Sequence, residues 1–114
     1  MNPVQFYKCL SDDTRLRCLI LIEREGELCV CELTEALQVT QPKISRHLAL
    51  LRECGLLTDR REGQWVFYSI NTELPQWVID VIELTAEKNI DFISLNHKQL
   101  LNMGSRPERI NNCC

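Results

Sequence analysis

The sequence predicts a mainly helical protein with one small β-hairpin, an α+β fold in a single domain over residues 1–103. Apolar residues recur at helical spacing through most of the 114-residue chain. Residues 65–70 instead alternate, and Gly63 stands just before them, where a tight turn needs a positive φ. A chain of this length has a core adequate for independent folding, helped by dimerisation.

For the N-terminal part of the chain, the sequence predicts three short helices. A helix over residues 3–10 is opened by a proline, which the first turn tolerates. Ser11 is expected to cap a second helix, with two aspartates in its first turn and its end before Gly26. Residues 30–37 form the third helix.

A fourth helix begins after Thr40, which we expect to cap it. Ile44, Leu48 and Leu51 share one face and should pack inward. Between Thr40 and Arg52 the sequence has no carboxylate, so the outward face is basic and hydroxylic and suits a phosphate backbone. The candidate DNA-contacting residues on this helix are Gln41, Lys43, Ser45, Arg46 and His47.

Two strands follow, over residues 57–61 and 65–70, with the turn between them at Gly63. Val66, Tyr68 and Ile70 alternate as the buried face. Near the tip, DNA contacts are expected from Arg60, Arg61 and Gln64. A helix, a turn, a recognition helix and a basic hairpin in this order indicate a winged helix-turn-helix.

After Asn71 the sequence predicts one long helix with a continuous apolar stripe along one face. The stripe is longer than a small domain should cover, so we expect it to pack against a second copy, with residues 3–10 joining in. The alternative is a helix folded back on its own core. The expected interface residues are Val78, Ile82, Ala86, Ile90 and Ile93. Residues 104–114 are polar and are expected to form a flexible tail.

Charge is unevenly distributed. The net charge of −3 does not favour a protein that binds nucleic acid with its whole surface. Residues 38–70, however, carry two more basic than acidic side chains, while residues 1–37 carry three more acidic than basic ones. Basic charge is thus concentrated on the segment expected to meet double-stranded DNA. No apolar run approaches the length needed to span a bilayer, and the N-terminus lacks a signal-peptide pattern, so we expect a cytoplasmic protein without membrane contact.

Seven cysteines are an odd number for a disulfide framework, and without an export signal we expect reduced thiols. Cys9 and Cys18 fit helical apolar patterns, Cys54 ends the expected recognition helix, and all three are expected to be packing residues. Cys29 with Cys31, and Cys113 with Cys114, are candidates for binding a soft ion because they are paired.

Four segments resemble the ArsR/SmtB family of metal-responsive repressors: LSDDTRLR at 10–17, ELCVCEL at 27–33, QPKISRHL at 41–48 and DRREGQWVFY at 59–68. The resemblance covers about residues 4–95 and is closest to the arsenic-responsive members. It implies a homodimer that binds an inverted-repeat operator and dissociates when As(III) or Sb(III) binds, with no catalytic cofactor.

The resemblance carries two metal ligands over, onto Cys29 and Cys31. A third cysteine follows three residues later in some relatives, but here that position is Thr34, a poor ligand for a thiophilic ion. The third ligand stays open between Cys113 or Cys114, a water or hydroxide, and no third protein ligand if the inducer is an organoarsenical.

The spacing of the cysteine pair also suggests how binding could reach DNA. On a regular helix, side chains two residues apart project about 200° from one another. Chelation should therefore unwind or reorient the first turn of helix 30–37, and this change would misplace Lys43, Ser45 and Arg46 on the DNA. The expected coupling between inducer binding and DNA binding is about 1–3 kcal/mol.

Other functions remain open from the sequence. A cadmium or lead sensor could use the same thiols. Zinc is less suited, because His97 with scattered Asp80, Glu83 and Glu87 is an incomplete ligand set for the C-terminal helix. A thiol-redox regulator is a further alternative. Enzyme activity is not expected, since Ser45 and His47 face apart on one helix and the cysteines lack a context that lowers their pKa.

Overall fold

The computed structural model describes residues 1–113, and the side chains of residues 1–111. The chain begins with α1 (Pro3–Leu10) and α2 (Asp13–Glu25). The predicted cap of α2 is wrong by one residue: Asp12 is the N-cap, and its carboxylate accepts the backbone N–H of Arg15. Ser11 instead ends α1 and donates its hydroxyl to the carbonyl of Lys8. Gly26 ends α2 with φ 87°, as predicted.

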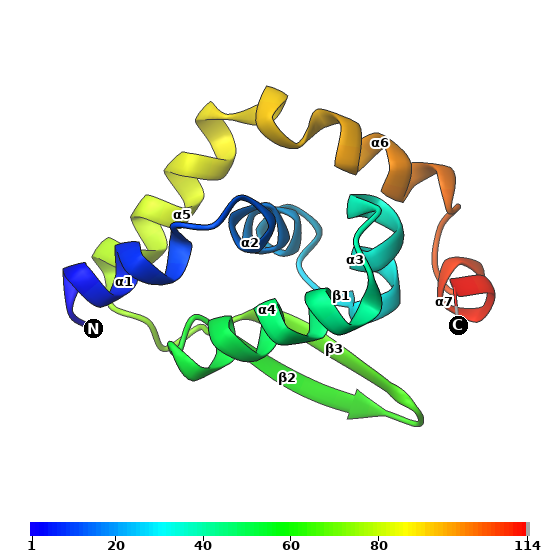
Figure 1. Ribbon diagram of the computed structural model, residues 1–114, viewed down its shortest axis with the longest axis horizontal. Coiled ribbons are helices and arrows are strands. Elements are labelled where there is room, and N and C mark those ends of the chain that lie inside the picture. The colour runs from blue at the N-terminus through cyan, green and yellow to red at the C-terminus, as the bar shows by residue number, and fades with distance from the viewer. Residues whose placement is uncertain (114) are drawn as a thin grey trace.

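The helix-turn-helix consists of α3 (Val30–Leu37) and α4 (Gln41–Glu53), which lie at the front of the molecule in Figure 1. The tight connection between them turns at Gln38, which adopts a left-handed φ of 55°. Thr40 precedes α4 as predicted, although its side chain makes no capping hydrogen bond. The apolar side of α4 is fully buried, which confirms the predicted inward face of Ile44, Leu48 and Leu51.

The wing is an antiparallel hairpin of β2 (Leu57–Glu62) and β3 (Trp65–Ile70) turning at Gly63, whose φ is 61°. A short strand that the sequence did not indicate, β1 (Leu28–Cys29), pairs with the other edge of β3, so the sheet order is β1-β3-β2. Two residues are too few to show a periodicity of two. This strand places Cys29 opposite Phe67.

Strand β3 is buried on both faces rather than on one. Tyr68 packs in the main core, while its neighbour Phe67 packs in a second cluster with Cys29 and Ile110. The predicted alternation of Val66, Tyr68 and Ile70 missed Phe67 because a residue from the C-terminal segment covers the opposite face of the sheet.

The predicted long C-terminal helix is interrupted. Helix α5 (Gln76–Lys88) ends at Asn89, a 3-10 turn follows at Ile90–Ile93, and α6 (Ser94–Asn102) continues in a new direction around α2 and α3 (Figure 1). This bend lets the apolar stripe wrap around the chain's own core. The stripe therefore has no apolar surface left for a second copy at four of its positions, which are at most 5% exposed: Val78, Ile82, Ala86 and Ile93. For these four residues the predicted role in a dimer interface is corrected to core packing. Ile90, at the bend, is 55% exposed.

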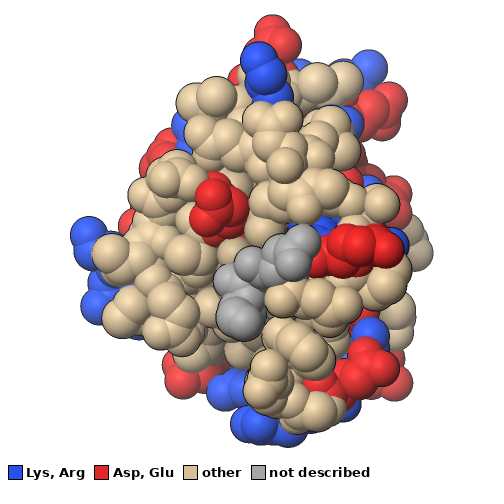
Figure 2. Space-filling model, turned by 90° about the vertical axis from the view of Figure 1, so that its right-hand side faces the viewer, with Lys and Arg blue, Asp and Glu red and all other residues tan. Residues whose placement is uncertain are grey.

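The segment after Gly104 includes α7 (Glu108–Cys113), which packs against α3 at the far end of the molecule from α1 (Figure 1). Figure 2 views this end, where much of the surface is uncharged, acidic side chains stand near the middle and most Lys and Arg lie toward the edges. The flexibility expected for residues 104–114 stays a prediction. Across the described residues, no helix combines the length and the apolar character that crossing a bilayer requires.

Candidate functional site

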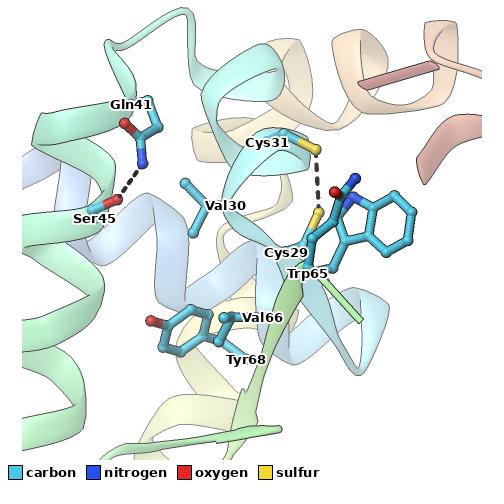
Figure 3. A pocket seen from close by; sticks show the side chains of 9 residues that line it. Cys29, Val30, Cys31, Gln41, Ser45, Trp65, Val66 and Tyr68 are labelled. Carbon is cyan, nitrogen blue, oxygen red and sulfur yellow. Dashed lines mark hydrogen bonds between the residues drawn. The ribbon is translucent and has the colours of Figure 1, made fainter. Parts of the chain in front are cut away.

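The sulfur atoms of Cys29 and Cys31 converge at the start of α3. Their Sγ atoms are 3.4 Å apart, and Figure 3 shows the two side chains pointing toward one another beside the indole of Trp65. Metal–thiolate bonds of about 2.3 Å let one soft ion bridge two sulfurs at this separation. The structure thus brings together the two predicted ligands.

Convergence is achieved without distorting the helix, which corrects the premise that sulfurs at this spacing cannot meet on a regular first turn. Cys29 lies in β1 and is the N-cap residue of α3, with extended backbone angles (φ −95°, ψ 169°). The rule of 100° per residue applies within a helix, and Cys29 stands outside it. Its side chain can therefore turn toward Cys31 while α3 keeps a regular first turn.

The Cys29 thiol is shielded from solvent, being 2% exposed. Burial raises the pKa of this thiol from 9.0 to about 11, and the nearby carboxylate of Glu32 adds to the increase. Backbone N–H groups of Glu32 and Cys31 act in the opposite direction, but their effect is smaller. Cys29 is therefore a protonated thiol at neutral pH, and a ligand must displace that proton.

Thr34 does not replace the third cysteine, because its hydroxyl donates to the carbonyl of Val30, 2.9 Å away within α3. The other predicted candidates, Cys113 and Cys114, lie outside the side chains that the structure describes. Among residues 1–111, no three His, Cys, Asp or Glu side chains converge as a metal site, and His97 instead lies 3.5 Å from Glu25.

An open pocket of about 480 Å³ joins the thiol pair to the recognition helix. Gln41 and Ser45 of α4 lie across the pocket from Cys29 and Cys31 (Figure 3). Gln41 donates to the Ser45 hydroxyl at 3.0 Å. The rest of the lining is mostly apolar or aromatic: Val30, Gln64, Trp65, Val66 and Tyr68. An occupant bound to the sulfurs would therefore lie close to two residues predicted to contact DNA.

The predicted DNA-contacting residues of α4 divide into two groups. Gln41, Lys43 and Arg46 are exposed, and Ser45 is half-buried in the pocket. His47 turns back toward α2: its Nδ1 lies 3.3 Å from Arg15 and its Nε2 3.7 Å from Asp12. Burial lowers the pKa of His47. His47 thus lies in the contact between α2 and α4, and its role at DNA stays a prediction.

The wing residues also differ from one another. Arg61 and Gln64 are exposed near the tip. Arg60 points along the other face of the hairpin, where its guanidinium makes two contacts of 2.7 and 2.8 Å with Glu27 and lies over the ring of Phe67. A phosphate would have to compete with Glu27 for this side chain.

Sequence reasoning missed three charged residues next to the thiol pair. Glu32 is fully buried, and the guanidinium groups of Arg106 and Arg109 both reach its carboxylate. One signal was present: an acidic residue at the third position of a helix is typical of a capping box. The arginine partners are more than seventy residues away in sequence, so no local pattern connects them.

Comparison with known proteins decides the family. Residues 12–59 match the family described as "Bacterial regulatory protein, arsR family". The Pseudomonas putida arsenic resistance transcriptional regulator ArsR1 is 54% identical over 108 residues, 95% of this chain and 84% of that protein. The chain belongs to the arsR family. ArsR2 of the same organism is 51% identical over 100% of this chain and 99% of its own length.

The arsR family also accounts for the fold. The reduced form of HlyU from Vibrio cholerae matches with a TM-score of 0.67 and 35% identity, over 75% of this chain and 86% of that one. The antimony-specific transcriptional repressor AntR matches with a TM-score of 0.63 and 31% identity, over 77% of each chain. These likenesses confirm the predicted winged helix-turn-helix and the family resemblance.

Proposed function

We propose that this arsR-family chain is an arsenic-responsive transcriptional repressor that releases its operator when As(III) or Sb(III) binds Cys29 and Cys31. The observation that carries the proposal is the 3.4 Å approach of the two sulfurs in a pocket that also holds Gln41 and Ser45 of α4. Relatives named as arsenic resistance regulators support the choice of inducer. The protein acts in the cytoplasm, where thiols stay reduced, and it is not an enzyme.

Signalling passes through the pocket and does not need an unwound helix. An ion on the two sulfurs fixes the start of α3 and occupies space opposite Gln41 and Ser45. A shift of α4 relative to the wing then misplaces Lys43 and Arg46 on the DNA. A coupling of about 1–3 kcal/mol lowers operator affinity about 5- to 150-fold.

The repressor acts as a homodimer on an inverted repeat, with one α4 in each of two successive major grooves. The exposed apolar residues of α1 and α5 form the interface. These helices lie side by side, with the Phe6 and Trp77 rings 5.2 Å apart. The residues available to a partner are Val4, Tyr7, Trp77 and Leu84, each at least 37% exposed.

The third position on arsenic is filled either by Cys113 or Cys114, or by a hydroxide or carbon substituent. The tail is favoured because the segment that precedes these cysteines packs on α3, with Ile110 against Cys29. A methylated trivalent arsenical would need no third thiolate, and the largely apolar pocket wall has room for its substituent.

The decisive experiment measures release of a fluorescent operator duplex by arsenite, under full reduction, through fluorescence anisotropy. The wild type should release DNA when arsenite is added. The double variant Cys29→Ser/Cys31→Ser should bind DNA and should not release it when arsenite is added. Cys54→Ser, at the opposite end of α4, is the matched thiol control. Release by arsenite from the double variant would reject the proposal.

Two further arms separate the alternatives. Cys113→Ser/Cys114→Ser should weaken the response to arsenite but not to a methylated trivalent arsenical if the tail supplies the third thiolate. A redox regulator would release DNA on mild oxidation and ignore arsenite under reduction, and a cadmium or lead sensor would respond to those ions at lower concentration than to arsenite.

A further inference from the structure

The C-terminal segment is tied to the thiol site by arginines. Arg106 Nη2 lies 2.6 Å from Glu32 Oε1, and Arg109 Nε lies 2.7 Å from Glu32 Oε2. Arg106 also donates to the carbonyl oxygen of Glu27 at 3.0 Å, and its guanidinium lies over the Phe67 ring at 4.9 Å. Two cations from one segment thus converge on a single carboxylate of α3.

Burial makes these ion pairs strong constraints. Glu32 is 0% exposed and Arg109 is 8% exposed. A buried carboxylate is tolerated when it is paired and hydrogen-bonded, and removal of a partner leaves a costly uncompensated charge. The arginines therefore hold Glu32 in the interior, at the base of the site.

Glu32 in turn fixes Cys29. Its Oε1 accepts the backbone N–H of Cys29 at 2.9 Å, while the Cys29 sulfur faces the backbone N–H of Glu32 in a reciprocal capping box. This pair of contacts holds Cys29 in the extended conformation that directs its sulfur toward Cys31. Ile110, from the same segment as the arginines, packs against Cys29.

We propose that Arg106 and Arg109 are positioning residues of the inducer site, which act through Glu32 to hold the Cys29 sulfur in place for the metalloid. The inference rests on the proposed function of Cys29 and Cys31 as inducer ligands. It assigns the C-terminal segment a role that does not depend on its cysteines.

The physical reason is preorganisation. Without the arginines, the Glu32 carboxylate gains by turning toward water, and the Cys29 amide loses its acceptor. The Cys29 backbone is then free to leave the N-cap conformation, and the two sulfurs have to be brought together when the ion binds. Removal of groups that orient metal ligands typically lowers affinity about 10- to 100-fold.

The test uses the full-length, reduced chain and arsenite, followed by the ultraviolet absorption of arsenic–sulfur bonds. Dissociation is started by adding an excess of a small dithiol. Arg106→Ala/Arg109→Ala should release arsenite about tenfold faster or more. Arg106→Lys keeps a cation within reach of Glu32 and should stay near the wild-type rate. The matched control is Arg24→Ala, an exposed arginine on α2.

A second readout separates positioning from general damage. Operator affinity without arsenite should be the same within about threefold for all variants, because α4 keeps its contacts and the Arg106 side chain touches the wing at the Phe67 ring rather than at the exposed residues Arg61 and Gln64. The single variants Arg106→Ala and Arg109→Ala are measured too, since each removes part of the ion-pair cluster and is milder for folding. Wild-type dissociation rates in both singles and in the double variant would overturn the inference.

Failure of the proposed function looks different. If the wild type shows no arsenic–sulfur absorption and no operator release, Cys29 and Cys31 are not the inducer site. If the wild type responds and the arginine variants respond equally, the thiol site stands and the positioning role is wrong.

Discussion

Cys29 Sγ lies 3.4 Å from Cys31 Sγ even though the two residues flank the first residue of a helix. The approach depends on Cys29 being the N-cap residue, paired with Phe67 across β1 and β3. The two sulfur atoms thus lie close together at the start of a regular α3, so binding does not require this helix to unwind.

The proton balance of binding distinguishes arsenic from divalent metals. Burial raises the pKa of Cys29 to about 11, so this ligand is a thiol at neutral pH. Arsenous acid condenses with thiols to release water, so its affinity should change less than about threefold between about pH 6 and about pH 8. Cadmium displaces protons instead, so its affinity should rise at least about tenfold per pH unit.

Operator-release titrations at several pH values measure both dependences, with Cys29→Ser/Cys31→Ser as the blank. An arsenite affinity that climbed as steeply as that of cadmium would contradict the proposed chemistry.

Exposed basic residues of α4 should dominate the salt dependence of DNA binding. Lys43→Ala and Arg46→Ala are each expected to cost about 1–3 kcal/mol of binding free energy, and to reduce the slope of log K against log salt by about 1 if they contact phosphates. Anisotropy titrations at several salt concentrations measure this. Lys98→Ala, exposed on α6, is the control and should leave the slope unchanged.

The dimer interface should respond to charge on α5 and not on α6. Leu84 is 56% exposed on α5, and Leu101 is 58% exposed on α6. Leu84→Asp should shift the protein to monomer and weaken operator binding, because a carboxylate would be buried between copies. Leu101→Asp should leave the dimer intact. Sedimentation measures both, and the opposite pattern would move the interface to α6.

Alkaline pH should destabilise the fold through its buried thiols. Burial raises the pKa of Cys18 from 9.0 to about 12, that of Cys9 to about 12 and that of Cys29 to about 11. Below about pH 9 these thiols are protonated in both states. Above it the unfolded thiols ionise first, so the folded state binds more protons and the free energy of unfolding falls as pH rises.

Urea denaturation under reduction, between about pH 8 and about pH 11, measures this decline. Cys18→Ala should be less stable throughout, but its decline should be shallower by about 1.4 kcal/mol per pH unit, the contribution of one proton. Parallel pH profiles for the two proteins would show that Cys18 does not ionise on unfolding.

Local sequence patterns were sufficient to predict the elements that depend only on residues close together in the chain. The inward face of α4 follows from residues three and four apart, and the Gly63 turn from the need for a positive φ. Prediction failed where distant segments meet. β1 exists because β3 offers it an edge, and the interrupted α5–α6 stripe is buried because the chain bends at Asn89 around α2.

The sequence was enough to define the family resemblance, the DNA-reading helix and the two cysteines, since each depends on residues close together in the chain. Tertiary structure decided how the site is built. The 3.4 Å sulfur separation requires the N-cap conformation of Cys29, and the buried charge of Glu32 requires arginines from the C-terminal segment. A buried ion pair between α3 and α7 has no period or spacing in sequence, because it forms only when folding brings the two distant segments together in an interior where a desolvated charge needs a partner.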